Sequence, residues 1–314
     1  MLQRLGQAGL VLGGSGIAAA LGILSPGRRA APPGARAIPR RSVPADPRWP
    51  RAAIARGGPV AALVRAAVDR VGGMGRFVRP GESVLVKPNM AWDRTPEQGA
   101  NTHPEVVAEV VRLCREAGAA RVVVGEVPVH DPARVASRSG IGAAARGAGA
   151  VLLMPPGAGF VPASLGGSVV DRWEVFAPAL DADRLINVPV VKDHALSRLT
   201  CGMKNLYGLL GGGRGRLHQR IHAAIADLAS AFGPTLTVVD ATRVMLRGGP
   251  QGGRLDDVLR VGAVGAGTDP VALDAWGATL IGADPLEIGH IVLARGRGLG
   301  TFGDGPIEEI HAGG

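Results

Sequence analysis

Lysine, aromatic residues and cysteine are all scarce in this chain of 314 residues. Lysine occurs only at positions 87, 192 and 204, although arginine occurs 32 times. The two cysteines, Cys114 and Cys201, allow at most one disulfide and are too few for a four-cysteine zinc or iron–sulfur site. We therefore expect no iron–sulfur cluster within this chain, and the rarity of lysine makes the surroundings of each one informative.

Acidic residues are nearly absent from the first part of the chain. Residues 1–80 contain 13 arginines and two acids, whereas residues 81–314 contain 22 basic and 24 acidic residues. The net charge of +9 therefore comes from the N-terminal part, and the rest of the chain is almost neutral. Because a protein that binds duplex by counterion release needs a basic face on its folded body, we expect no nucleic-acid partner.

The sequence also lacks an apolar run that predicts a membrane-spanning helix. Residues 1–25 have a short basic start and a run rich in Gly, Ala and Leu, which is typical of an export signal or a membrane tether. They look like the tail of a twin-arginine signal without the paired arginines, so either the true start lies upstream or the likeness is accidental. A signal predicts an exported protein, periplasmic or membrane-associated. If this segment is instead a buried or disordered segment, the expected location is the cytoplasm.

Local patterns after this segment predict a linker and then one folded domain. Residues 26–57 are rich in Pro, Arg and Ala without periodicity, which predicts a disordered linker with weak attraction to anionic lipid. The domain is expected to span residues 58–314. Residues 84–86 predict a strand, a helix follows Thr102, and residues 120–126 predict the next strand.

The start of that helix has clear sequence signals. Thr102 and Glu105 predict a capping box, and Pro104 suits the first turn. A strand–helix–strand unit of this length implies parallel pairing. We therefore expect an α/β fold with a mainly parallel or mixed sheet flanked by helices.

Residues 185–210 are the most informative stretch. An apolar strand ends in Lys192, Asp193 and His194, and ten residues after His194 come Lys204 and Asn205. The carboxyl ends of parallel strands share one edge of a sheet, so polar groups at strand ends and helix starts are expected to face one crevice. These groups are Lys87, Asn89, Asn101, His103, Glu126, Lys192, Asp193, His194, Lys204, Asn205 and Asp240.

The residue types in this set suit an anionic small molecule such as a carboxylate or a phosphate. His194, Lys192 and His103 are the candidate catalytic residues, because imidazoles and amines transfer protons. The candidate ligand-binding residues are Lys87, Asn89, Asn101, Lys204, Asn205 and Asp240. The alternative interpretation is that the lysines are solvated surface charges and that Asn205 caps a helix.

A divalent metal is the one cofactor for which the sequence offers ligands. His218 and His222 are four residues apart on a predicted helix, which places both imidazoles on one face, and Glu126 can add a carboxylate. The alternative is a pair of exposed histidines. Residues 211–215 read Gly-Gly-Gly-Arg-Gly and match no phosphate-binding pattern, so we interpret them as a flexible flap over the crevice.

Several segments together resemble the family called domain of unknown function 362. They are VLVKPN (84–89), NTHPEVV (101–107), LINVPVVKDH (185–194), GMKNLYGLL (202–210), HQRIHAAIADL (218–228), VVDA (238–241) and GTDPVALDAWG (267–277). Many members look fused to a ferredoxin-like domain that this chain does not contain, and others look exported through a twin-arginine signal. The resemblance implies a fold for residues 58–300 but no particular reaction.

Three functions remain open from the sequence. The first is an exported protein whose crevice binds an anionic small molecule, with or without a metal, and for which catalysis is left open. The second is a non-catalytic binding protein for a small anionic metabolite. The third is a redox accessory protein that works with a separate iron–sulfur partner. The sequence does not indicate an oligomeric state.

Overall fold

The computed structural model describes residues 34–303 and 307–312. The signal-like segment 1–25 lies outside them. The compact unit begins at Gly34, inside the stretch 26–57 for which the sequence predicts a linker. That prediction is wrong for residues 36–37 and 52–56, which form strands β1 and β2. Four of the five residues of β2 are buried, and both of its pairing partners come from the C-terminal sixty residues of the chain, so its local sequence does not reveal it.

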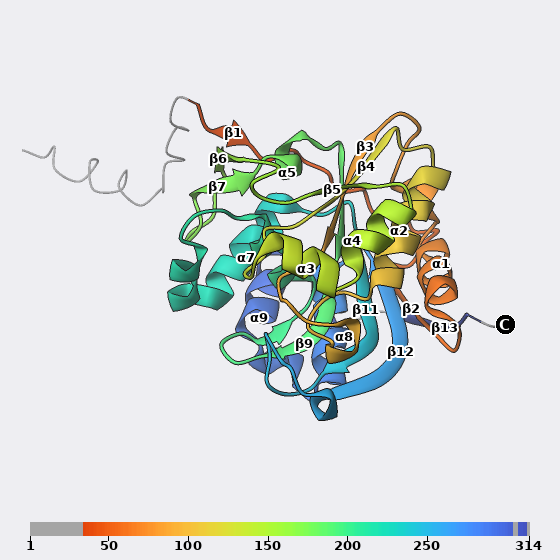
Figure 1. Ribbon diagram of the computed structural model, residues 1–314. Coiled ribbons are helices and arrows are strands. Elements are labelled where there is room, and N and C mark those ends of the chain that lie inside the picture. Colours follow the sequence, from red (N-terminus) through yellow and green to blue (C-terminus); the bar gives the residue numbers. More distant parts are fainter. Residues whose placement is uncertain (1–33, 304–306, 313–314) are drawn as a thin grey trace, which may run out of the picture. The chain divides into compact units, whose positions relative to one another are not determined.

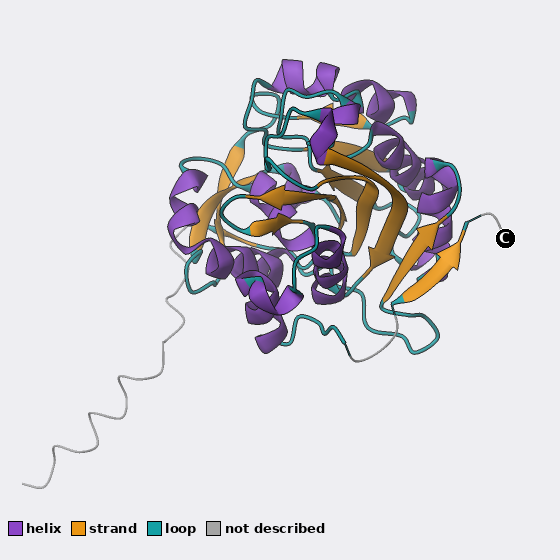
Figure 2. Ribbon diagram, turned by 90° about the horizontal axis from the view of Figure 1, so that it is seen from below, coloured by secondary structure: helices purple, strands orange, loops and turns teal. Residues whose placement is uncertain are grey.

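A large mixed sheet forms the centre of this unit (Figures 1 and 2). Strands β11, β8, β3, β4 and the edge strand β5 are parallel, whereas β12 is antiparallel to both of its neighbours. The order across the sheet is β13 (Glu308–His311), β2 (Ala52–Arg56), β12 (Val258–Gly267), β11 (Leu236–Met245), β8 (Arg184–Val188), β3 (Ser83–Pro88), β4 (Arg121–Gly125) and β5 (Val151–Leu153). The predicted α/β class with a mixed sheet is confirmed.

Smaller strands complete the fold. β9 (Val190–His194) pairs with β11 and, antiparallel, with β10 (Arg198–Thr200). A separate three-stranded sheet contains β1 (Arg36–Ala37), β6 (Phe160–Ser164) and β7 (Arg172–Phe176). The residues predicted as one strand, 185–194, thus form β8 and β9. Pro189 separates them because proline cannot donate a ladder hydrogen bond.

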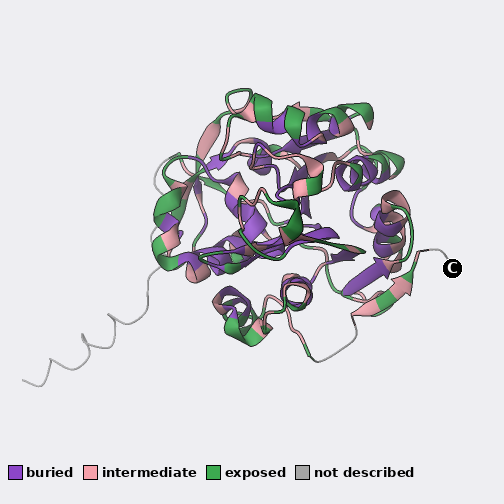
Figure 3. Ribbon diagram, turned by 60° about the horizontal axis from the view of Figure 1, so that its bottom comes forward, coloured by how far each residue is buried: buried purple, intermediate pink, exposed green. Residues whose placement is uncertain are grey.

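Helices cover the large sheet, and the core lies between them and the strands (Figures 2 and 3). In β3, Val84 and Val86 belong to the core under α1 and α2, whereas Leu85 belongs to the core that contains α7, α8 and α9. This alternation follows from the two-residue period of a strand. The helices are α1 (Val60–Arg70), α2 (Pro104–Glu116), α3 (Pro132–Arg138), α4 (Ile141–Gly147), α5 (Pro178–Asp181), α6 (Gly202–Asn205), α7 (Ile221–Phe232), α8 (Pro270–Leu280) and α9 (Gly289–Gly296).

Within the described ranges, no helix has the length and apolar character that crossing a bilayer requires.

Asp227 on α7 joins this helix to two distant segments, and we expect Asp227→Asn to lower the free energy of unfolding by about 2–3 kcal/mol. Its carboxylate accepts hydrogen bonds from the amides of Val169 and Val170 at 2.6 and 2.9 Å and lies 2.8 Å from the Arg297 guanidinium. Urea denaturation measures the loss. Asp181→Asn is the control, because the Asp181 side chain is 61% exposed and its ion pair contributes less than about 1 kcal/mol.

The effect of Asp227→Asn should also depend on pH. Burial alone would raise the pKa of Asp227, but the two amides and Arg297 outweigh it and lower the pKa below the ordinary value of 3.8. A carboxylate with a lowered pKa stabilises the fold above its unfolded pKa and loses that contribution as the pH falls through its folded pKa. The stability difference between the wild type and the variant should therefore shrink below about pH 4. A difference that stays constant to pH 2 would contradict this account.

Candidate functional site

A cavity of about 230 Å³ opens where β3, β4 and β9 end, and we call it the lysine pocket. All three lysines of the chain line it, together with five other polar residues predicted from the sequence. The predicted residues that the structure brings together here are Lys87, Asn89, Glu126, Lys192, His194, Lys204, Asn205 and His218.

Lys87 and Glu126 form a buried ion pair in this pocket. Lys87 Nζ lies 2.6 Å from Glu126 Oε2, and the two side chains are 1% and 2% exposed. Lys87 Nζ also donates to Pro88 O at 2.7 Å and to Asn205 Oδ1 at 2.9 Å. Burial lowers the pKa of Lys87, and the charge of Glu126 opposes that effect. An ammonium has three hydrogens, so Lys87 has no donor left for a ligand.

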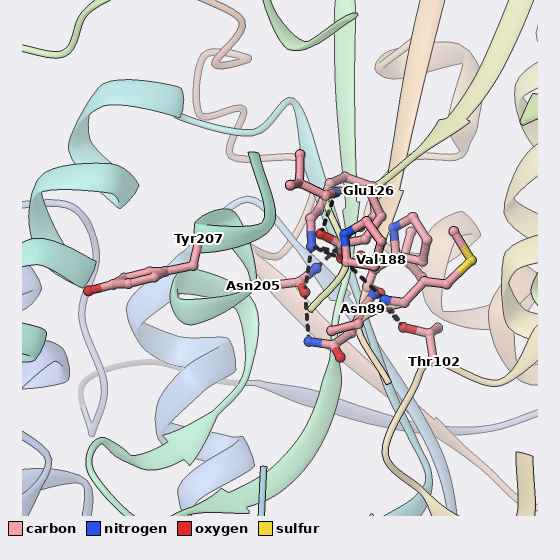
Figure 4. A network of polar contacts seen from close by, with 12 residues as sticks. Asn89, Thr102, Glu126, Val188, Asn205 and Tyr207 are labelled. Atoms are coloured by element: carbon pink, nitrogen blue, oxygen red, sulfur yellow. Dashed lines mark hydrogen bonds and ion pairs between the residues drawn. The ribbon is translucent and has the colours of Figure 1, made fainter. Parts of the chain in front are cut away.

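Two asparagines connect the lysines (Figure 4). Asn205 Oδ1 accepts from Asn89 Nδ2 at 3.0 Å as well as from Lys87, and Asn89 Oδ1 accepts from Lys192 Nζ at 3.1 Å. Asn205 Nδ2 donates to Asn187 Oδ1 at 2.8 Å. A continuous chain of hydrogen bonds therefore fixes the positions of Lys87 and Lys192 relative to each other.

Among the described residues, neither Lys192 nor Lys204 has a carboxylate partner of the kind that Lys87 has in Glu126. Lys192 Nζ donates to Ala100 O at 2.5 Å and to Asn89. Burial, and next the charge of Lys204, lowers the pKa of Lys192 well below its ordinary value. Burial, followed by the charges of Arg214 and Lys87, lowers the pKa of Lys204 to about 7. The Lys204 ammonium lies 4.4 Å from the centre of the Tyr207 ring, and none of the described residues accepts a hydrogen bond from it.

His194 and His218 stack in the pocket with ring centres 6.4 Å apart and planes at 17°. His194 Nδ1 accepts from the amides of Leu196 and Ser197 at 3.1 and 3.3 Å, which assigns its proton to Nε2. Burial and the charges of Lys204 and Lys192 lower the pKa of His194 to about 3, so this imidazole is neutral at physiological pH. His218 Nδ1 lies 2.9 Å from Gly215 O, and because a carbonyl only accepts, Nδ1 carries the proton.

The two imidazoles therefore offer complementary groups. His194 presents an Nε2–H donor, and the His218 tautomer with its proton on Nδ1 presents Nε2 as an acceptor. One donor and one acceptor in the same cavity are what proton transfer to and from a bound molecule requires.

His103, Asp240 and Asn101 do not line the lysine pocket, contrary to the prediction. The strand expected to end on Asp240 continues to Met245, because β11 pairs with β12 along its whole length. The Asp240 carboxylate is buried and accepts from the His103 amide at 2.7 Å. The His103 side chain lies at a separate cavity beside Arg243, and burial lowers its pKa.

Two further details of this region differ from the prediction. The N-cap of α2 is His103, whose Nδ1 accepts from the Glu105 amide at 3.2 Å. The Thr102 hydroxyl instead donates to Val188 O at 2.7 Å and accepts from the Asn89 amide at 2.9 Å. Asn101 Oδ1 accepts from the amides of residues 91 and 92, so Asn101 holds the loop that carries Trp92.

The predicted pairing of His218 and His222 on one helical face is wrong. Residues Arg214–Arg220 form a 3₁₀ helix and α7 begins at Ile221, so the two imidazoles do not follow one α-helical repeat. The His222 ring stacks instead on His290, with ring centres 5.5 Å apart. Across residues 34–303 and 307–312, no cluster of three or more His, Cys, Asp and Glu side chains has the placement to hold a metal ion.

Of the lining residues that the sequence did not predict, four have polar side-chain atoms: Trp92, Thr200, Tyr207 and Arg214. The Thr200 hydroxyl is buried and has no hydrogen-bond partner in the described part of the chain. Thr200 is opposite Lys192 in the β9–β10 pair, so antiparallel register could have indicated it. No local pattern distinguishes Trp92.

Arg214 fixes the glycine-rich segment that was predicted to be a flexible flap. Its guanidinium donates to Tyr207 O and Leu210 O at 3.2 Å, and to Val127 O and Pro128 O at 2.8 and 3.2 Å. Four carbonyl acceptors hold this side chain across the rim of the lysine pocket. The segment is therefore part of the wall.

Comparisons with known proteins agree with the resemblance seen in the sequence. The family described as "Domain of unknown function (DUF362)" matches residues 84–279, which run from β3 into α8. The chain is 31% identical over 240 residues to the "Thylakoid-associated protein sll1697" of Synechocystis sp., covering 74% of this chain and 73% of that protein.

Among solved structures, the lactate racemase apoprotein from Thermoanaerobacterium thermosaccharolyticum shares 11% identity and a TM-score of 0.44 with this chain. That alignment covers 79% of this chain and 61% of the other, so this chain spans less than two thirds of that protein. The likeness is too weak to carry an argument about function. The family match extends over more than half of the residues, and the chain therefore belongs to the family DUF362.

Proposed function

We propose that the lysine pocket binds a small anionic molecule that carries a carboxylate or a phosphate. The observation that carries this proposal is the charge of the lining: four cationic side chains, Lys87, Lys192, Lys204 and Arg214, and one carboxylate, Glu126. Since Glu126 is paired with Lys87, the positive charge of the other three has no partner in the lining. A buried charge without a partner is costly, and an anion would remove that cost.

Free hydrogen-bonding groups support the same ligand class. The Lys204 ammonium and the Thr200 hydroxyl both line the cavity without a protein partner among the described residues. An oxyanion can accept from both. A unit negative charge about 4 Å from an ammonium contributes about 4 kcal/mol at an effective dielectric constant of about 20, so charge should dominate the choice of ligand.

Binding of oxalate and inorganic phosphate tests the proposal. At 100 times the dissociation constant, either ion should stabilise the protein by about 2.7 kcal/mol in a thermal unfolding assay. Oxamide, the neutral analogue of oxalate, should give no shift. Lys204→Met should weaken oxalate binding at least tenfold. The matched control is Arg79→Met, which removes one exposed charge at the opposite end of β3. Equal shifts with oxalate and oxamide, or no shift with either ion, would reject the anion pocket.

The affinity for oxalate should fall above pH 7. The pKa of Lys204 is about 7 in the free protein, and an anion favours the ammonium form. Binding then requires uptake of a proton once the pH exceeds that pKa, and the apparent dissociation constant should rise by up to about tenfold per pH unit. Calorimetric titration between pH 6 and 9 measures this dependence. An affinity that increases with pH would contradict it.

A further inference from the structure

The three lysines differ in the number of hydrogen bonds that their amino groups donate to the protein. Lys87 donates to three acceptors, and Lys192 donates to two. Lys204 donates to none of the described residues and lies over the face of Tyr207. It is also the most exposed of the three, at 8% against 1% for each of the others. Among the described residues, the Lys204 amine is therefore the one that the protein leaves free for a molecule in the pocket.

The surroundings of Lys204 favour a neutral amine. Its neighbours Arg214 and Lys87 are cationic, and their charges add to the effect of burial in lowering its pKa. With a pKa of about 7, about half of the Lys204 side chains carry a free electron pair at neutral pH, whereas an ordinary lysine has almost none. Burial beside other cations is a known way to activate a lysine as a nucleophile.

We propose that Lys204 condenses with the carbonyl carbon of a small oxo-acid bound in the lysine pocket and forms an imine. This inference rests on the proposed function, because the carboxylate of the oxo-acid would occupy the same cationic pocket, where the Thr200 hydroxyl is a free donor. It narrows the ligand from any small anion to one that carries a ketone or an aldehyde next to its acid group. A cavity of about 230 Å³ suits a molecule of this size.

The chemistry balances without an external reactant. The Nζ electron pair attacks the carbonyl carbon, an N–C bond forms, and the carbonyl electrons move to oxygen, which takes up a proton. The nitrogen releases one proton to give the neutral carbinolamine. The carbinolamine then loses its hydroxyl group as water when that oxygen takes up a second proton, the C=N bond forms, and the nitrogen releases its second proton. The products are one imine and one water.

The stacked imidazoles supply a proton donor and a proton acceptor for these steps. His194 Nε2–H is a donor that can hydrogen-bond to the developing oxyanion, and the His218 tautomer with its proton on Nδ1 offers Nε2 as the acceptor for a proton from nitrogen. Both rings line the same cavity as Lys204. Because the protein already fixes the ring of each histidine through Nδ1, both imidazoles are preorganised.

Reductive trapping tests the inference directly. The full chain is incubated with glyoxylate or pyruvate and sodium cyanoborohydride, and the adduct is located by peptide mass spectrometry. The chain contains only three ε-amino groups, so the assignment is unambiguous. We expect one adduct per chain at Lys204, and we expect Lys204→Arg to remove it. The initial rate should rise through pH 7 and level off above it, because the neutral amine reacts.

The outcomes separate this inference from the anion site on which it rests. If oxalate binds the wild type but glyoxylate and pyruvate are trapped only at other amines or not at all, the imine is rejected and the anion site stands. If oxalate does not bind and nothing is trapped at Lys204, both proposals fail. Propanal, which lacks a carboxylate, should label Lys204 at least tenfold more slowly than glyoxylate. Equal labelling by the two aldehydes would reject the oxo-acid as the ligand class.

Discussion

Replacing Glu126 by glutamine is expected to lower the free energy of unfolding by about 3–5 kcal/mol. The carboxylate accepts from Lys87 at 2.6 Å, from the Met90 amide at 3.2 Å and from the Val127 amide at 2.9 Å, and it is almost fully buried. Glutamine leaves the Lys87 ammonium buried without a counter-charge. Urea denaturation monitored by circular dichroism measures the loss.

A matched control shows whether the loss of stability depends on the burial of the ion pair or only on the loss of one negative charge. Glu309→Gln breaks the ion pair with Arg56, but the Glu309 side chain is 59% exposed, so the expected loss is below about 1 kcal/mol. The double variant Lys87→Met/Glu126→Gln removes both charges and should recover part of the stability that Glu126→Gln loses. A double variant as unstable as the sum of its two single variants would contradict the ion-pair explanation.

The loss in Glu126→Gln should also become smaller as the pH rises. Burial already lowers the pKa of Lys87, and removing Glu126 takes away the charge that opposes this shift. A lysine whose folded pKa lies below its unfolded pKa binds more protons in the unfolded state, so stability increases with pH between the two values. The variant should therefore approach the wild type towards pH 10. A pH-independent difference would argue against a charged Lys87 in the folded protein.

Gly208→Ala is expected to destabilise the protein by about 3 kcal/mol or more. A Cβ at position 208 would lie 1.8 Å from Glu126 Oε1 and 2.7 Å from Lys87 Nζ. The carboxylate cannot move away without losing hydrogen bonds to Lys87 and Val127. Gly208 O also accepts from the Val127 amide at 3.0 Å, which fixes the backbone at this position. Only glycine lets the backbone approach the buried ion pair so closely.

Gly215→Ala is the control for this substitution, because no atom lies within 4 Å of the added Cβ. Its effect should be within about 0.5 kcal/mol of zero. Since Gly208→Ala acts by displacing the Glu126 carboxylate, its effect should be far from additive with Glu126→Gln. The double variant should lose clearly less than the sum of the two single losses. Additive losses would show that the alanine acts elsewhere.

Local sequence patterns predicted the elements that carry the lysine pocket. Lys87 and Lys192 follow apolar residues at the ends of predicted strands, and Glu126 follows the strand after Lys87. The carboxyl ends of parallel strands meet at one edge of a sheet, so their proximity could be derived from the chain alone. The position of Lys204 is harder to predict from the sequence, because this residue lies in the short helix α6 and not at the end of a strand. Its rarity as a residue type, and not its periodicity, pointed to the pocket.

Contacts between segments that are distant in the sequence explain why the positions of some residues were predicted wrongly. Asp240 looks like the end of a strand, but the hairpin with β12 extends β11 to Met245 and buries the carboxylate next to the His103 amide. His222 has helical spacing from His218, yet the 3₁₀ turns before Ile221 separate the two rings. The two strands that pair with β2 lie more than two hundred residues away along the chain.

The sequence by itself determined the α/β class, the strand ends that carry Lys87 and Lys192, and the family. Those features depend on the hydrophobic periodicity and the residue types of one segment, which can be read without knowing which other segment it packs against. The tertiary structure alone decided the charge state of the site. Asn89, Asn205 and Glu126 accept from the other two lysines, and none of the described residues accepts from Lys204, whose pKa is lowered by burial beside Arg214. Such desolvation and pairing come from segments that meet only in the folded chain.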